Sequence, residues 1–289
     1  MKFAVFTVSI PEWTPDVAVD RLKAIGYDGV EWRIQDQSET PGAATFWGNN
    51  QATLPLSTLV EDAPAWRKLT EDAGLEMPSI GTYVKCDDLA SVEQGMLGAK
   101  ALGVPRLRVT VPSYDGVAPF RPLFESAKAQ YRDVADLAAK HGVKALLELH
   151  HRSITPSAST ARLFLDGLDP NHVGVIHDAG NMVHEGYEAH RLSLEMLGPY
   201  LAHVHIKNAR WFPMKYHEDG SVEWKCDWAP LGKGIIDQRA LFVALRAVGF
   251  DGWIGVEDFS TEQALEQRLQ GNLVYLRKLA EETAIQAAG

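Results

Sequence analysis

Eight strand-like runs that alternate with eight helix-like segments predict an α/β fold of the (β/α)8 TIM barrel type for this chain of 289 residues. One further observation favours a closed barrel over a doubly wound open sheet. The first strand is followed by Ser9, Ile10 and Pro11, which do not resemble a glycine-rich phosphate turn. No linker or low-complexity stretch divides the chain. We therefore expect a single barrel domain over residues 1–289.

The strands are predicted where short runs of β-branched, aromatic and aliphatic residues are bounded by turn residues. Each run is followed by enough chain for a helix, as parallel strands require. None approaches the roughly 18–20 apolar residues that cross a bilayer. The runs occupy residues 3–8, 29–34, 77–84, 106–111, 144–149, 173–177, 201–206 and 253–257.

The helices are predicted between these strands. The segment 120–141 is the clearest, because its apolar residues recur at spacings of three and four. The last helix begins after Ser260, an N-cap residue with Gln263 three positions on. Gly26 and Gly249 stand where a left-handed residue would end a helix. The predicted helices span 16–26, 57–74, 88–103, 120–141, 158–168, 187–200, 237–249 and 261–283.

Two connections between strand and helix are long, residues 35–56 and 208–236. The second carries Trp211, Phe212, Trp224 and Trp228. Connections that follow barrel strands lie at the C-terminal mouth, where active sites are found. We expect both to be loops that act as lids over the mouth.

Composition excludes several classes of protein. Hydrophobic residues make up 46% of the chain, which is enough for a large core and excludes wholesale disorder. A formal net charge of −10 repels phosphate backbones, so we expect no nucleic-acid partner, and no apolar run suggests a membrane partner. Cys86 and Cys226 lie far apart, which favours two reduced thiols and a cytoplasmic location.

Four polar side chains stand at or just beyond the C-terminal ends of strands five to eight. They are Glu148, Asp178, His205 and Glu257. Three carboxylates and an imidazole at one mouth would repel one another unless a cation joined them. The sequence therefore predicts a divalent metal ion bound by these four side chains, and the ligand set suits Mn, Mg, Co or Zn.

The alternation of side chains along a strand predicts on which face of the strand each neighbouring histidine lies. His203 lies one layer below His205, so we expect it in the core or beside the metal ligands. His177 is opposite in parity to Asp178 and should be packed, and His151 should face the helices. His150 is predicted at the rim, as a substrate contact or a polar surface group.

Several motifs carry a resemblance to a known family. They are GYDGVE at 26–31, Glu148, DAGN at 178–181, HIKN at 205–208, PLGKGIID at 230–237 and GFDGWIGVE at 249–257. With these motifs the chain resembles the sugar phosphate isomerase/epimerase family of the xylose-isomerase-like TIM barrel superfamily. The resemblance covers nearly the whole chain, and it implies the same metal ligands. The family habit and the aromatic residues of 208–236 also suggest a homo-oligomer.

The resemblance implies proton transfer on a keto sugar or a related polyol. A metal ion that chelates a carbonyl and the adjacent hydroxyl acidifies the proton between them and stabilises the enediolate. Glu148 and Glu257 resemble the acid–base pair of the ketose epimerases in this superfamily. We expect Lys207 and Arg210 to hold substrate oxygens, His150 to contact the substrate at the rim, and Glu31 to face the pocket.

The same motifs leave alternatives open. Asn181 stands where ketose epimerases commonly have a histidine, and no second glutamate follows the fifth strand around Ile154. An isomerase of another carbonyl sugar, an inosose-type dehydratase, a non-catalytic sugar-binding barrel and a metal-free barrel enzyme all remain. The DNA-repair phosphodiesterases that share this barrel use histidines from early strands, whereas the first histidine here is His141.

Overall fold

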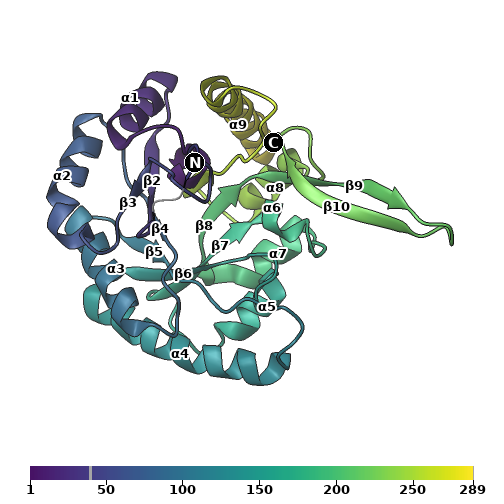
Figure 1. The fold of residues 1–289 in the computed structure, drawn as a ribbon, viewed down its shortest axis with the longest axis horizontal. Coiled ribbons are helices and arrows are strands. Elements are labelled where there is room, and N and C mark those ends of the chain that lie inside the picture. Colours follow the sequence, from purple (N-terminus) through teal and green to yellow (C-terminus); the bar gives the residue numbers. More distant parts are fainter. Residues whose placement is uncertain (39–40, 289) are drawn as a thin grey trace.

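The computed structural model describes residues 1–38 and 41–288, and a closed ring of parallel strands forms its centre (Figure 1). The ring runs in the order β1-β2-β4-β5-β6-β7-β8-β11, and β11 pairs with β1 to close it. The strands are β1 (Lys2–Phe6), β2 (Gly29–Ile34), β4 (Ile80–Thr82), β5 (Arg106–Arg108), β6 (Lys144–Glu148), β7 (Val173–Asp178), β8 (Leu201–Ile206) and β11 (Trp253–Val256). The predicted (β/α)8 barrel and its eight strands are confirmed. Residue 289 of the predicted domain lies outside the described residues.

Helices surround this ring on its outer side (Figure 1). They are α1 (Pro15–Ile25), α2 (Leu59–Asp72), α3 (Leu89–Leu102), α4 (Phe120–His141), α5 (Ala158–Phe164), α7 (His190–Leu197), α8 (Gln238–Ala247) and α9 (Leu265–Ala288). The bounds of α4 coincide with the prediction, and Gly26 ends α1 with a φ of 104°. In the described part of the chain, no helix combines the length and the apolar character needed to cross a membrane.

The first strand is shorter than predicted, because the chain turns before it reaches the mouth. Thr7–Ser9 form the 3-10 helix η1, and the Ser9 hydroxyl donates a hydrogen bond to the Phe6 carbonyl. Phe6 itself points into the barrel. A Cβ atom on Gly81 would lie 2.2 Å from the Phe6 ring, so only glycine leaves room for it there. The ring stacks on His205 at 5.5 Å and forms a floor under the mouth.

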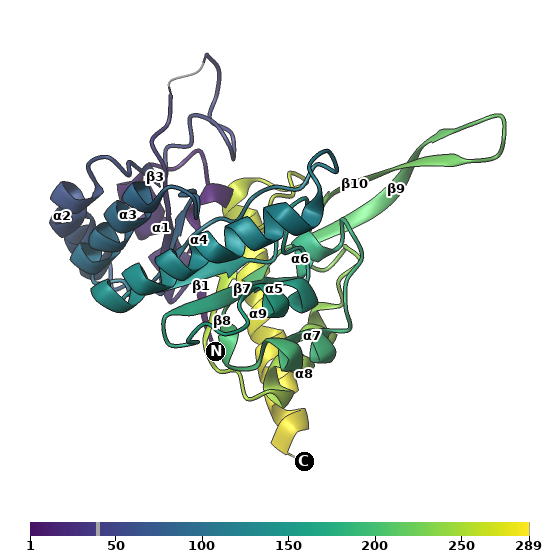
Figure 2. The same ribbon diagram turned by 90° about the horizontal axis from the view of Figure 1, so that it is seen from below.

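The long connection predicted as a loop over 208–236 instead contains an antiparallel hairpin. Its strands are β9 (Asn208–Tyr216) and β10 (Val222–Ala229), with a register shift between Glu223 and Trp224. Figures 1 and 2 show that the hairpin projects well beyond the barrel. Pro213 and the many charged residues hide the strand alternation, which explains why the sequence indicated a loop.

The other long connection, after β2, lies at the same end of the barrel as the hairpin (Figure 2). It contributes the short strand β3 (Thr53–Leu54), which pairs with β2. Residues 39–40 of the predicted lid lie outside the described residues. The smaller elements α6 (Ala179–Met182) and η2 (Gly198–Tyr200) complete the connections around β7 and β8.

His177 on β7 is packed, as predicted, and should make stability depend on pH. Its side chain is fully buried, and Nε2 lies 3.0 Å from the Ser193 hydroxyl. Burial, followed by nearby His190, lowers the pKa of His177 to about 3. Since the unfolded chain takes up this proton near pH 6.5, the stability that neutral His177 contributes is complete above that pH and is lost as the pH falls towards 3.

The expected loss between pH 7 and pH 5 is about 2 kcal/mol from this residue. Urea unfolding of the parent at both pH values, compared with His177→Gln, measures it as the difference in pH dependence. His217→Gln, at an exposed position on the hairpin tip, is the control and should behave like the parent. An unchanged pH dependence in His177→Gln would contradict this assignment.

Candidate metal centre and active site

The four predicted metal ligands meet at the mouth of the barrel. Glu148 and Asp178 end β6 and β7, His205 is the penultimate residue of β8, and Glu257 follows β11. One donor atom of each lies within 4.8 Å of the others, and all four side chains are buried. Parallel strands end at the same edge of a barrel, so strand-end residues distant in sequence converge there.

His205 Nδ1 lies at the centre of this cluster. It is 3.2 Å from Glu148 Oε1 and 3.9 Å from both Asp178 Oδ2 and Glu257 Oε2. Asp178 and His205 are paired directly across β7 and β8. The arrangement points one imidazole nitrogen and three carboxylate groups at a common volume.

Lys207 is the cation closest to these carboxylates. Its ammonium lies 2.8 Å from Asp178 Oδ2 and 3.9 Å from Glu148 Oε1, and it donates a hydrogen bond to Glu257 Oε2. Lys207 Nζ also lies over the rings of Trp228 and Phe259, 5.4 and 5.3 Å from their centroids. Lys207 therefore lies within the cluster and borders the pocket.

Arg108 is a second buried cation, and it was not among the residues predicted from the sequence. Its guanidinium donates a 2.6 Å hydrogen bond to Glu148 Oε2, and the Asn181 amide is 3.4 Å from Glu148 Oε1. Burial alone would raise the pKa of Glu148, but Arg108 and Lys207 outweigh it and hold the pKa well below its usual range. The strand was predicted over 106–111, which placed Arg108 in its middle, whereas β5 ends at Arg108; the criterion that identified Glu148 therefore did not apply to it.

The residues of this cluster fit a divalent cation. Asp178 Oδ2 is buried and accepts no well-aligned hydrogen bond, although Lys207 is within ion-pair distance. Burial, together with the like charges of Glu148 and Glu257, raises the pKa of Asp178 to about 7 despite Lys207. The positive charge of Lys207 thus does not fully offset the mutual repulsion of the three carboxylates. Oxygen and imidazole donors suit Mn, Mg, Co or Zn, and such an ion would compete with Lys207 for Asp178 and Glu257.

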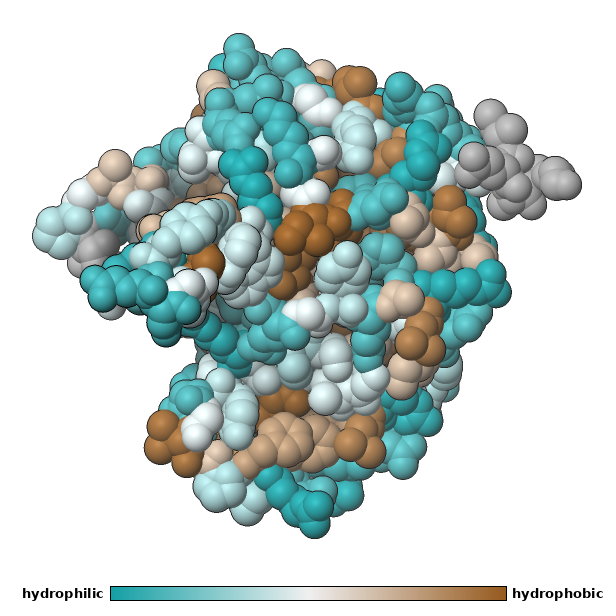
Figure 3. All heavy atoms as spheres, turned by 90° about the vertical axis from the view of Figure 1, so that its right-hand side faces the viewer, coloured by the Kyte–Doolittle hydropathy of each residue, from teal (hydrophilic) through white to brown (hydrophobic). Residues whose placement is uncertain are grey.

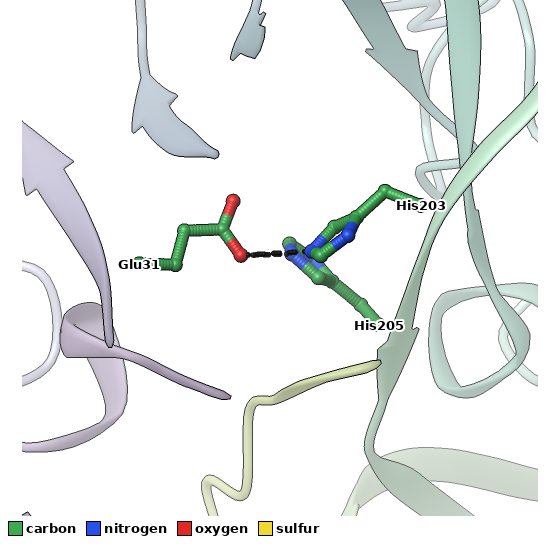
Figure 4. Close-up of side chains that lie close together, drawn as sticks. All are labelled: Glu31, His203 and His205. Atoms are coloured by element: carbon green, nitrogen blue, oxygen red, sulfur yellow. Dashed lines mark hydrogen bonds and ion pairs between the residues drawn. The ribbon is translucent and has the colours of Figure 1, made fainter. Parts of the chain in front are cut away.

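Glu31 does not face the pocket, and this corrects the sequence-based expectation. It lies in the middle of β2, three residues before the strand ends, and its carboxylate is fully buried. Oε2 lies 3.1 Å from His203 Nε2 and 3.0 Å from His205 Nε2 (Figure 4). Since an ionised carboxylate only accepts hydrogen bonds, each imidazole donates from Nε2. Nδ1 of His205 faces the other three ligands; while it carries a proton it donates to Glu148 Oε1, and it offers its lone pair to a metal ion once that proton is lost.

His203 lies one layer below His205, as predicted, and shares the same Glu31 oxygen. Burial, which Glu31 opposes, lowers the pKa of His203. Burial also acts to lower the pKa of His205, but the interactions with Glu31 and Glu148 outweigh it. The pKa of His205 is therefore raised well above its usual value. The two histidines and Glu31 therefore form a buried support beneath the cluster.

The remaining predicted substrate contacts divide into two groups. His150 and Lys207 line the large pocket over the cluster. Arg210 does not border this pocket; it is exposed on the hairpin, 3.3 Å from Glu262. His151, expected to face the helices, lines the pocket instead. Strand β6 ends at Glu148 and Arg152 has a φ of 57°, so alternation does not extend to His151.

The pocket is a cavity of about 1430 Å³ at the barrel mouth. Its floor contains Glu148, Lys207 and Glu257, and Arg108 and Asn181 also border it. Aromatic side chains from the hairpin and from the connection after β2 form much of its wall. The candidate acid–base groups are thus accessible from a pocket large enough for a small organic substrate.

Comparison with protein families matches this chain to one model. The model describes the xylose isomerase-like TIM barrel and matches residues 19–279. An inosose dehydratase from Geobacillus thermodenitrificans is 30% identical over 131 residues, which cover 43% of this chain and 43% of the relative. The matched region thus spans less than half the length of this curated relative.

Three solved structures share the fold over nearly their whole length. The 3-keto-D-glucoside 4-epimerase from E. coli has a TM-score of 0.72 at 18% identity and covers 96% of this chain and 99% of its own. The IOLI protein with a bound zinc atom has a TM-score of 0.69 at 18% identity, with coverage of 99% and 98%. A Mycobacterium smegmatis barrel in complex with magnesium has a TM-score of 0.71 at 16% identity, with coverage of 98% and 97%.

Proposed function

Because the chain belongs to the xylose isomerase-like TIM barrel family, we propose that it is a divalent-metal-dependent isomerase or epimerase of a keto sugar or related polyol. The convergence of Glu148, Asp178, His205 and Glu257 at the base of the pocket carries the proposal. Zinc and magnesium in two structures of the same fold support a divalent ion. Sugar-acting proteins among the similar chains support the substrate class.

Asp178 and His205 would hold the ion together with Glu148 and Glu257. The chemistry that a bound divalent ion supplies is polarisation of a carbonyl and its neighbouring hydroxyl, which weakens the bond to the proton between them. Glu31 would keep His205 in the tautomer that offers Nδ1. Arg108 keeps Glu148 ionised, which makes it a good ligand but a weaker base.

Glu257 is therefore the favoured proton acceptor. It borders the pocket and receives a hydrogen bond from Lys207, whose ammonium can also face a substrate oxyanion. Glu148 lies on the far side of β7 and β8 from Glu257 in the barrel order, which suits return of a proton from another direction. A keto sugar bound over both carboxyl groups would lose a proton to Glu257 and regain one from Glu148, which must first take up a proton from water because Arg108 holds it ionised.

A second candidate is an inosose-type dehydratase, favoured by the sequence similarity to inosose dehydratases. Its first step is the same removal of a proton beside a carbonyl. The neighbouring C–O bond then breaks, a C=C bond forms and the hydroxyl leaves as water. Incubation with keto sugars and inososes in D₂O with Mn²⁺ separates the two candidates. The product of an epimerase gains deuterium and keeps the remaining mass of the substrate, whereas the product of a dehydratase is lighter by one water molecule.

A non-catalytic sugar-binding barrel would bind such compounds without any deuterium exchange. Exchange with at least one keto sugar or inosose is the expected result, and its location identifies the reacting carbon. Failure of every compound in the panel, with metal bound, would contradict the proposed enzyme activity.

Asp178→Ala should remove most of the metal affinity. The change deletes a ligand whose oxygen has no other well-aligned partner, so we expect at least a 10-fold weaker Mn²⁺ affinity with the fold retained. Isothermal titration with Mn²⁺ measures the affinity, and circular dichroism checks the fold. Asp136→Ala, at an exposed position on α4, is the matched control. Parental affinity in Asp178→Ala would show that this cluster does not bind the ion.

A further inference from the structure

The pocket is larger than a single sugar ring requires. Its volume is about 1430 Å³, whereas sites for drug-sized ligands usually measure about 300–1,000 Å³. A monosaccharide at the metal cluster would leave much of this space to water. The walls of the unused part therefore indicate what else the substrate carries.

A continuous row of six aromatic rings crosses the pocket. The successive ring centroids are 4.9, 5.3, 5.1, 4.0 and 4.4 Å apart. We call this row the aromatic strip, and all of its members border the pocket. In order they are Trp47, Phe259, Trp228, His184, His151 and His150.

The middle of the aromatic strip lies over the proposed acid–base groups. Lys207, which contacts Glu257, is 5.3 Å from the Phe259 ring and 5.4 Å from the Trp228 ring. A reacting sugar ring would lie against these two aromatic rings. The strip continues beyond that place in both directions, so one sugar ring cannot cover it.

Trp47 is the most exposed large aromatic ring of the strip. The residue is 56% exposed, yet its ring packs at a tilt against Phe259, 4.9 Å away, and borders the pocket. Figure 3 shows hydrophobic side chains exposed on the side from which the hairpin projects. A tryptophan that is half-exposed at the rim of a pocket offers a flat apolar face that a ligand ring can cover.

We propose that the substrate is a glycoside, in which the reacting keto sugar carries a second ring that stacks on Trp47. The second ring is either another sugar or an aromatic aglycone, since both present a flat face of C–H or π character. This inference rests on the proposed function for the reacting ring. Binding of the second ring does not depend on the reaction, so it can be tested with ligands that are not turned over.

The test compares three unreactive ligands by isothermal titration: methyl β-D-glucoside, cellobiose and phenyl β-D-glucoside. At least one of the two-ring ligands should bind the parent about 5- to 10-fold more tightly than the methyl glucoside. Trp47→Ala should remove this difference and leave the affinity for methyl glucoside unchanged. Tyr216→Ala, which changes an exposed aromatic ring on the hairpin outside the pocket, should keep the difference.

Equal affinity for all three ligands, or no detectable binding of any of them at millimolar concentration, would overturn the inference. So would a preference for two rings that survives in Trp47→Ala. The relative affinities of cellobiose and phenyl glucoside tell whether the second ring is a sugar or an aglycone. A two-ring preference without deuterium exchange on any keto compound would refute the proposed function but not the glycoside site.

Discussion

Glu257→Gln should lower the rate of solvent deuterium exchange at the substrate carbon by about 10²–10⁴-fold. The substitution keeps the volume and one oxygen, but it removes the group that accepts the proton. Metal binding should weaken without disappearing, because Asp178, His205 and Glu148 remain. Exchange followed by NMR, with the metal content measured in the same samples, separates loss of the base from loss of the ion.

Glu148→Gln should also impair turnover, through a different step. Arg108 occupies Oε2 of Glu148 and holds it ionised, so this carboxylate serves mainly as a ligand and returns a proton only after it has taken one up from water. We expect product formation to fall more than deuterium exchange. Glu223→Gln, at an exposed position on β10, is the matched control and should keep the parental rate.

Parental exchange in Glu257→Gln would make Glu257 a ligand only. Glu148, His150 or Lys207 would then be the next candidates for the base. If both glutamine variants keep the parental activity, removal of a proton beside a carbonyl is not the reaction of this protein.

Substitution of Glu31 should affect both the metal affinity and the stability of the fold. In Glu31→Leu the buried Nε2–H groups of His203 and His205 lose their acceptor, which should destabilise the fold by about 2–5 kcal/mol. Glu31→Gln keeps an acceptor oxygen but loses the charge, so we expect a nearly parental stability and about 10- to 100-fold weaker metal binding. Urea unfolding and titration with Mn²⁺ measure the two effects.

Gly255→Ala tests the same support without removing any of its groups. A Cβ atom at this position would lie 2.7 Å from His205 Cδ2 and 3.0 Å from Glu31 Oε2. It would push the two side chains apart, so metal affinity should fall although all the polar groups remain. Parental metal affinity in both Glu31→Gln and Gly255→Ala would show that Glu31 does not position His205.

Much of the site could be predicted because barrel geometry brings strand ends together. Once the strands were recognised by their short apolar runs, Glu148, Asp178, His205 and Glu257 had to meet at one mouth. Side-chain alternation also placed His203 below His205 and predicted that His177 is packed. Strand ends and side-chain alternation depend on residues that are close in the sequence, so they can be predicted without knowledge of the packing.

The sequence by itself determined the barrel, the order of its elements and the four side chains that share its mouth. Only the tertiary structure decided that Glu31 lies below the mouth and supports His205, because alternation tells which face a side chain occupies but not its depth. It also paired Arg108 with Glu148, which is 40 residues away, and placed Trp47 in one row with Trp228 and His151. Contacts of this kind depend on how loops and strands pack across the barrel, and no local pattern in the sequence specifies them.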